Sequence, residues 1–211
     1  YDKFKITAGN EDDENNYYEV QFFAFRDAEL NKLLPNELNP KEIKKYCSSE
    51  GGKFVDKYTP IFYSAKHNVL IIHNESYSHP EGAATDSLGT SVNVVNLANP
   101  KQEINFEESF KDKNFQNNPQ LLQMIKNKIL TDREIEDDGD VFPEDMVVSA
   151  YMYIEGFNAN KIGRKNSLIF GYSQGAIFPR AAGEVIISFT PEEINPFLKE
   201  NSLLYQLLND K

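Results

Sequence analysis

Tryptophan is absent from the 211-residue sequence, and cysteine occurs only once, as Cys47. A single cysteine excludes an intrachain disulfide, so cysteine usage does not reveal the redox compartment. No histidine is suitably placed to activate its thiolate, and we expect Cys47 to be a small buried apolar residue. The sequence also lacks a Cys pair, a Gly-rich phosphate loop and a Ser-x-x-Lys signature, and we expect no cofactor.

Long apolar runs are missing as well. The longest candidates, residues 68–73 and 146–154, are far shorter than the roughly 18 residues of a spanning helix. We therefore expect no membrane insertion of the folded body. The chain begins with Tyr1 rather than Met, and we expect a processed or truncated chain whose targeting segment, if any, has been removed.

Basic residues are outnumbered, with 22 Lys and Arg against 33 Asp and Glu, which gives a net charge of −11. Nucleic-acid binding requires clustered cations, so this balance argues against nucleic acid and against anionic membrane surfaces. A basic partner would instead be attracted. Hydrophobic residues at 40% still supply a core, for one large domain or two small ones that share it.

Patterns in the first half predict mainly strands. Residues 9–16 read as a polar loop, and residues 17–25 favour the first strand of a sheet. Asn39 and Pro40 predict a helix that ends at Gly51-Gly52. Three β-rich runs predict an antiparallel meander: residues 54–63, 68–77 and 90–97.

Patterns in the second half predict helices with clear starts. Asn118-Pro119 predicts the start of a helix, and Thr190 to Glu193 form a capping box for another. We expect a second helix start at Asn195-Pro196, with the following leucines covering the sheet. The predicted strands are residues 146–154, 167–172 and 184–189.

Residues 171–175 read GYSQG, which fits the Gly-x-Ser-x-Gly elbow of α/β-hydrolases and resembles the one in cutinases. In that fold an acid and a histidine follow the serine. The three histidines here all precede Ser173: His67, His73 and His79. Pro179 would also interrupt the helix that should follow. We interpret the segment as a strand that ends in a Gly-rich bend.

Two acidic or imidazole clusters suggest cation sites. Residues 134–145 loosely match a calcium loop, but the first and twelfth positions deviate and Pro143 obstructs the exiting helix. His73 and Glu75 could offer two zinc ligands from one strand face, without an evident third. We interpret both segments as solvated or hydrogen-bonded surface rather than metal sites.

Several short motifs follow one another in a distinctive order. Tyr77 precedes residues 82–84, which read GAA, and an acidic-aromatic segment at 106–110 comes before the Asn118 helix. Residues 177–183 then read IFPRAAG, ahead of a predicted strand and an acidic helix start. This order resembles an extracytoplasmic domain family of unknown function, found in the peptidoglycan deacetylase PdaC and the anti-sigma factor RsiV.

The resemblance implies an α+β fold with antiparallel sheets and packed helices. It implies a small N-terminal α/β part, residues 1–66, and a larger C-terminal sheet-and-helix part, residues 67–211, within one compact unit. In RsiV-like proteins the domain binds lysozyme, and in PdaC it accompanies a separate catalytic domain. We therefore expect an extracytoplasmic protein, periplasmic or at the cell surface, with a possible lipid anchor.

The expected function is a non-enzymatic cell-envelope recognition module that binds a lysozyme-like protein or a peptidoglycan-type glycan. The candidate ligand-binding residues mix aromatic, imidazole and acidic groups with glycine: Tyr77, His79, Glu81 and Gly82. The turn around Pro179, Ala181, Ala182 and Gly183 is interpreted as architectural, because proline fixes φ and glycine permits φ > 0. Two alternatives stay open: a serine esterase using Ser173, and a structural envelope domain without its own ligand.

Overall fold

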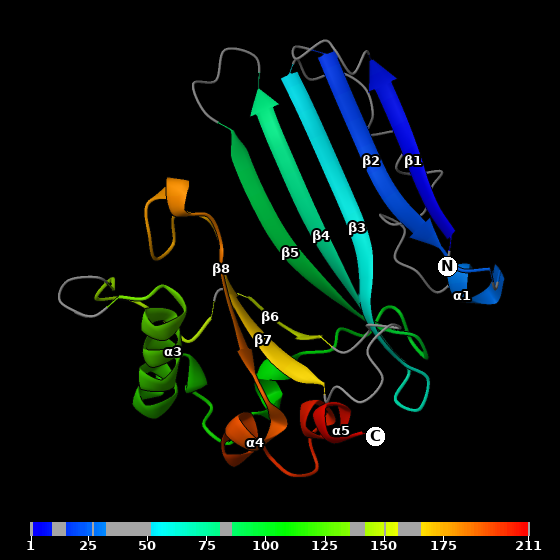
Figure 1. Cartoon of the computed structure of the whole chain (residues 1–211). Coiled ribbons are helices and arrows are strands. Elements are labelled where there is room, and N and C mark those ends of the chain that lie inside the picture. The colour runs from blue at the N-terminus through cyan, green and yellow to red at the C-terminus, as the bar shows by residue number, and fades with distance from the viewer. Residues whose placement is uncertain are drawn as a thin grey trace. The chain divides into compact units, whose positions relative to one another are not determined.

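The computed structural model describes eight stretches of the chain: residues 2–9, 16–26, 28–32, 52–80, 86–135, 142–149, 151–155 and 166–210. These stretches belong to two compact units, Tyr1–Ile104 and Asn105–Lys211 (Figure 1). The predicted helix at residues 39–51, Cys47 and residues 136–141 of the calcium-loop-like segment lie outside the described residues. No helix among the described stretches has the length and apolar character needed to cross a membrane.

The first unit contains a five-stranded sheet in the order β1-β2-β3-β4-β5. A short helix, α1 (Ala28–Lys32), follows β2. The strands are β1 (Asp2–Gly9), β2 (Asn16–Ala24), β3 (Gly52–Ser64), β4 (Val69–Pro80) and β5 (Ser87–Asn96). The predicted meander is confirmed, since β3, β4 and β5 pair antiparallel in sequence order.

Two features of this sheet differ from the sequence-based expectation. Strand β1 precedes the segment that was predicted to be the first strand, and it pairs antiparallel with β2. Strands β2 and β3 are parallel, so the sheet is mixed rather than antiparallel. A parallel neighbour requires a crossover connection, and nothing in the local β-pattern of either strand reveals that connection.

The expected boundary between residues 66 and 67 falls in the tight turn that joins β3 to β4. That turn contains Asn68 with φ 56°, a conformation that asparagine tolerates. Because β3 and β4 pair along almost their whole length, the turn lies inside one unit. The boundary between the two units instead falls in the sequence between Ile104 and Asn105, and the units are of similar length.

The second unit combines a three-stranded antiparallel sheet with helices. Its strands are β6 (Tyr151–Glu155), β7 (Ser167–Tyr172) and β8 (Val185–Phe189). Its helices are α3 (Pro119–Asp132), α4 (Pro191–Ile194) and α5 (Leu203–Asn209). Short 3₁₀ turns are η2 (Phe106–Ser109), η3 (Phe115–Asn117), η5 (Arg180–Ala182) and η6 (Asn195–Phe197).

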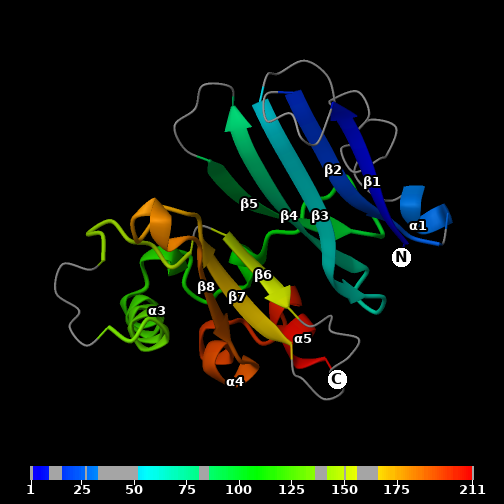
Figure 2. The same cartoon turned by 45° about the horizontal axis from the view of Figure 1, so that its top comes forward.

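Helix α3 begins where the sequence predicts. The Asn118 side chain accepts a hydrogen bond from the Leu121 amide, and Pro119 occupies the first turn. Leu121, Ile125 and Ile129 form the buried stripe, and α3 lies alongside β8 in both views (Figures 1 and 2). Lys128 joins the two elements, with its ammonium 4.8 Å from the centre of the Phe189 ring.

The C-terminal region confirms one predicted start and corrects another. The Thr190 capping box is present at α4. The second helix begins after Ser202, whose hydroxyl accepts from the Tyr205 amide, and not at Asn195-Pro196, which forms only a 3₁₀ turn. The predicted strand at 146–154 is likewise shorter, since β6 begins at Tyr151.

Candidate functional site

The predicted ligand-binding residues that the structure describes, Tyr77 and His79, lie on strand β4. They are two residues apart and therefore point to the same face of the sheet. The neighbouring strands place Val55 and Leu88 opposite Tyr77, and Lys53 opposite His79. Glu81 and Gly82 lie outside the described residues.

Asp86 joins the two predicted residues. Its Oδ1 lies 2.7 Å from Nδ1 of His79, and its carboxylate also accepts a hydrogen bond from Tyr77. These bonds, the one from His79 first, hold the pKa of Asp86 below its ordinary value. The carboxylate therefore remains ionised in mildly acidic solution and fixes both rings at the end of the hairpin.

An exposed apolar side chain lies directly beside this polar group. Leu88 is 53% exposed and faces Tyr77 across the β4–β5 pair. Toward the other neighbouring strand, β3, the Glu75 carboxylate forms an ion pair with the Lys57 ammonium at 2.6 Å. We call this set the Tyr77 surface and define it by its members: Lys53, Lys57, Glu75, Tyr77, His79, Asp86 and Leu88.

Sequence reasoning missed Asp86, Leu88 and Lys53. Asp86 lies a few residues after Gly82, the last of the four predicted binding residues, and nothing in the local pattern distinguishes it from other loop acids. The register of β4 against β5 is the signal that would have found it, because this register brings residue 86 beside residue 79. Lys53 was missed for the same reason, because only the register of β3 against β4 brings it opposite His79. Its ammonium lies 5.6 Å from the centre of the Tyr17 ring.

The suggested zinc ligands lie on the same face of β4. His73 Nδ1 is 3.7 Å from Glu75 Oε1. Glu75 in turn is bound to Lys57 at 2.6 Å, a cation that opposes a metal ion there. Within the described stretches, no group of three or more His, Cys, Asp or Glu side chains is arranged to hold a metal.

The Pro179 to Gly183 segment forms the single turn η5 between β7 and β8. Pro179 has φ −50° and Gly183 has φ 78°, so this glycine occupies the left-handed region that side chains disfavour. The Arg133 guanidinium donates to the carbonyl oxygens of Ala182 and Glu184 at 3.3 and 3.4 Å. The turn is thereby attached to the end of α3.

Ser173 follows β7 and starts a bend, and its carbonyl oxygen accepts from the Ala176 amide. The chain then passes through η5 into β8, an antiparallel strand. A nucleophile elbow instead leads from a strand directly into a long helix. All three histidines belong to the other unit, Tyr1–Ile104.

The other residues of the GYSQG segment have structural roles. A Cβ on Gly171 would lie 2.1 Å from Cζ of Tyr151, so the glycine accommodates that ring. Tyr172 is buried, which raises the pKa of its phenol, and its hydroxyl donates to the carbonyl oxygens of Val147 and Val148. Gly175 has φ 85°. Gly171, Tyr172 and Gly175 thus each meet a packing or turn requirement.

Comparison with known proteins identifies similar folds. No protein-family profile matches the sequence, and no curated protein resembles it in sequence. A crystal structure of a DUF3298 family member from Bacteroides fragilis matches with a TM-score of 0.66 and 14% identity, over 100% of this chain and 97% of that chain.

A second crystal structure, a DUF3298 family protein from Pseudomonas aeruginosa, matches with a TM-score of 0.60 and 14% identity, over 95% of both chains. The chain has a DUF3298-like α+β fold. This domain family is defined without a function.

Proposed function

We propose that the protein is a non-enzymatic recognition module of the cell envelope, which acts outside the cytoplasm. The proposal rests on the DUF3298-like fold together with the motif order that resembles the domain of PdaC and RsiV. The packing roles of Gly171, Tyr172 and Gly175 support it too, since they account for the hydrolase-like motif without catalysis.

The single observation that carries the proposal is the composition of the Tyr77 surface. Asp86 accepts hydrogen bonds from both His79 and Tyr77, so the polar groups of this surface are linked to one another. Leu88 supplies an exposed apolar centre next to them. Aromatic anchors are typical of binding hot spots, and Tyr77 is the aromatic residue of this surface.

The ligand we propose is a lysozyme-like protein or a peptidoglycan-type glycan. The net charge of −11 would speed the approach of a basic protein such as lysozyme, and added salt would slow it. On the surface itself, Lys57 pairs with Glu75, and His79 lies between Lys53 on β3 and Asp86. That balanced arrangement provides both donors and acceptors to a partner.

Calorimetric titration of the whole chain with lysozyme, and separately with soluble peptidoglycan fragments, tests the proposal. We expect saturable binding of at least one ligand, weakened about tenfold or more by Leu88→Ser, which corresponds to about 1.4 kcal/mol. Ile186→Ser is the matched control, because Ile186 is a 46% exposed aliphatic residue on β8 of the other unit. Absence of binding to both ligands, or equal losses in the two variants, would contradict the proposal.

A further inference from the structure

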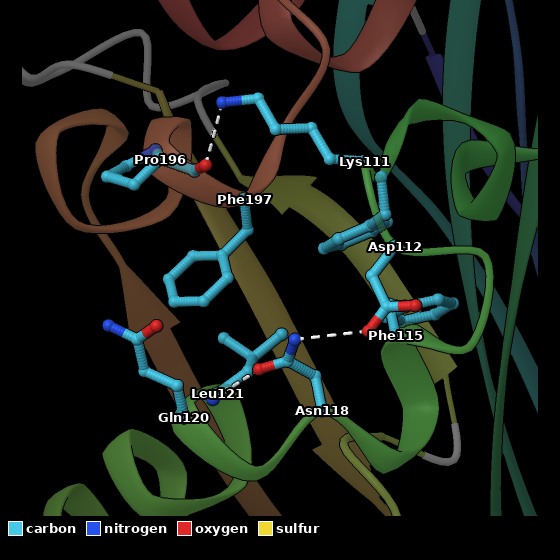
Figure 3. Close-up of a pocket in the computed structure, with 9 residues that line it drawn as sticks. Lys111, Asp112, Phe115, Asn118, Gln120, Leu121, Pro196 and Phe197 are labelled. Carbon is cyan, nitrogen blue, oxygen red and sulfur yellow. Dashed lines mark hydrogen bonds between the residues drawn. The ribbon is translucent and has the colours of Figure 1, made fainter.

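A pocket of about 220 Å³ opens on the second unit. None of the residues that line it belongs to the Tyr77 surface. It is formed by the segment around η3, the first turn of α3 and the turn η6 (Figure 3). Sites for drug-sized ligands measure about 300–1,000 Å³. This pocket therefore fits one chemical group of a larger ligand.

The inner part of the pocket is apolar and rigid. Phe110, Phe115 and Leu121 are each at most 3% exposed, and the two phenylalanine rings stack with their centres 4.1 Å apart. The Phe197 ring, only partly buried, points into the pocket (Figure 3). A methyl-sized apolar group can be buried against these rings, and a flat apolar face can lie on Phe197.

The rim is polar and carries one charge of each sign. Lys111 donates to the Pro196 carbonyl oxygen at 2.8 Å. The Asp112 carboxylate accepts from the Asn114 amide at 2.8 Å and from the Asn118 side chain at 3.2 Å. Two of its roughly four acceptor positions are used, so it can accept a further bond.

The rim also contains an exposed amide, the side chain of Gln120. Gln120 and Asp112 lie on opposite sides of the Phe197 ring (Figure 3). The Gln120 amide has a donor and an acceptor, with its oxygen nearer to Phe197 in Figure 3, and the Asp112 carboxylate supplies a further acceptor. Because Gln120 is exposed, its amide can rotate to present the donor to a ligand. A ligand group that fits this arrangement has a carbonyl on one side, an N–H on the other and a small apolar end.

We propose that this pocket binds the acetamido group of an N-acetylated amino sugar in a glycan chain. The methyl group packs on the apolar floor, the carbonyl oxygen accepts from Gln120, and the N–H donates to Asp112. The C–H face of the sugar ring lies against Phe197.

Other occupants fit less well. An apolar side chain would cover the polar rim and leave its groups unpaired, which costs about 1–3 kcal/mol for each buried group. An anion would be opposed by Asp112 and a cation by Lys111. A neutral group with both a donor and an acceptor avoids all three penalties.

This inference rests on the proposed function: it selects a glycan as one ligand of the module and assigns it to the pocket, which leaves the Tyr77 surface to the protein ligand. The test is titration of the whole chain with the tetramer of β-1,4-linked N-acetylglucosamine, and with cellotetraose as a neutral ligand without acetamido groups. We expect saturable binding of the first and at least about tenfold weaker binding of the second.

Two variants locate the site. Phe197→Ala and Gln120→Glu should each weaken binding of the acetylated tetramer by about tenfold. Glutamate in the first turn of a helix is favourable, so Gln120→Glu keeps the fold while it removes the donor. Gln123→Ala, on an exposed position of the same helix, is the control and should bind like the parent protein.

The inference is overturned if cellotetraose binds equally well, if the acetylated tetramer does not bind, or if both pocket variants bind like the parent. Loss of tetramer binding in Leu88→Ser, with binding unchanged in Phe197→Ala, would place the glycan on the Tyr77 surface. That result would reject the pocket and leave the proposed function intact. Lysozyme binding with no glycan binding would do the same.

Discussion

At the scale of single residues, Asp86 is the link between the two aromatic side chains of the Tyr77 surface. Its pKa is lowered, first by the His79 bond and then by the Tyr77 bond. A carboxyl group with a lowered pKa contributes stability above its unfolded-state pKa, and this contribution disappears as the pH falls through its folded-state pKa. The contribution of Asp86 is therefore an acid-sensitive one.

We predict that Asp86→Asn lowers the free energy of unfolding at neutral pH, and that its difference from the parent shrinks as the pH falls below about 4. Urea denaturation of both proteins over a pH series measures this difference. A difference that stays constant from neutral to strongly acidic pH would show that Asp86 gains nothing from its two partners.

Glu19 is a second residue whose charge matters, because it is only 5% exposed. Burial raises its pKa, but hydrogen bonds from Lys5, Tyr17 and Gln21 outweigh burial and lower the pKa overall. The Lys5 ammonium lies 2.6 Å from its Oε2. The pair joins the edge strand β1 to its neighbour β2 in the first unit.

We predict that Lys5→Met destabilises the protein by about 1–3 kcal/mol, because a buried carboxylate loses a charged partner. The half-exposed position of Lys5 favours the lower part of that range. Lys3→Met, a substitution at another exposed lysine of the same strand, is the control and should change stability little. Equal effects of both substitutions in thermal or chemical unfolding would contradict the role of the pair.

At the scale of elements, Gly171 determines how β6 packs against β7. The two strands pair with Tyr151 directly opposite Gly171, and the tyrosine ring lies over the glycine. Its hydroxyl donates to Glu184, and its ring stacks on Tyr153 with the two centres 6.2 Å apart. A side chain at position 171 would have to displace this ring.

We predict that Gly171→Ala costs about 1–3 kcal/mol, as is usual for overpacking. In the background of Tyr151→Ala the same substitution should cost much less, because the ring that it displaces is gone. The four free energies of unfolding in this double-mutant cycle provide the check. Additive effects would mean that the ring does not set the requirement for glycine.

Helix α3 depends on its N-cap residue. Asn118 caps the helix and also donates to Asp112. We predict that Asn118→Ala lowers the free energy of unfolding by about 1 kcal/mol. Gln123→Ala in the exposed middle of the helix should be neutral or slightly stabilising, since alanine has the higher helix propensity. If the two variants unfold alike, the cap contributes nothing.

The sequence predicted those elements whose determinants are local. The Asn118 cap, the Thr190 capping box and the hairpin between β3 and β4 depend on a few neighbouring residues, and all three are present. The parallel pairing of β2 with β3 depends instead on a crossover between distant segments. The sequence predicts the start of the last helix too early, because Pro196 is typical of a first helical turn. In the structure the cap of α5 is Ser202.

At the scale of the whole molecule, the candidate site was predictable only in part. Tyr77 and His79 stand out by composition, whereas Asp86 and Leu88 become neighbours only through strand register. The pocket around Phe197 combines residues about 80 positions apart, so no local pattern indicates it. The boundary between the two units after Ile104 was not predictable either, because it follows from which strands pair and not from a change in composition.

The central claim is that the Tyr77 surface is the recognition site. Amide hydrogen exchange of the whole chain, with and without saturating lysozyme or peptidoglycan fragments, tests it most directly. We predict slowed exchange at residues 53–57, 75–79 and 86–90 in the presence of at least one ligand. Unchanged exchange there, with either no protection anywhere or protection confined to the second unit, would contradict it.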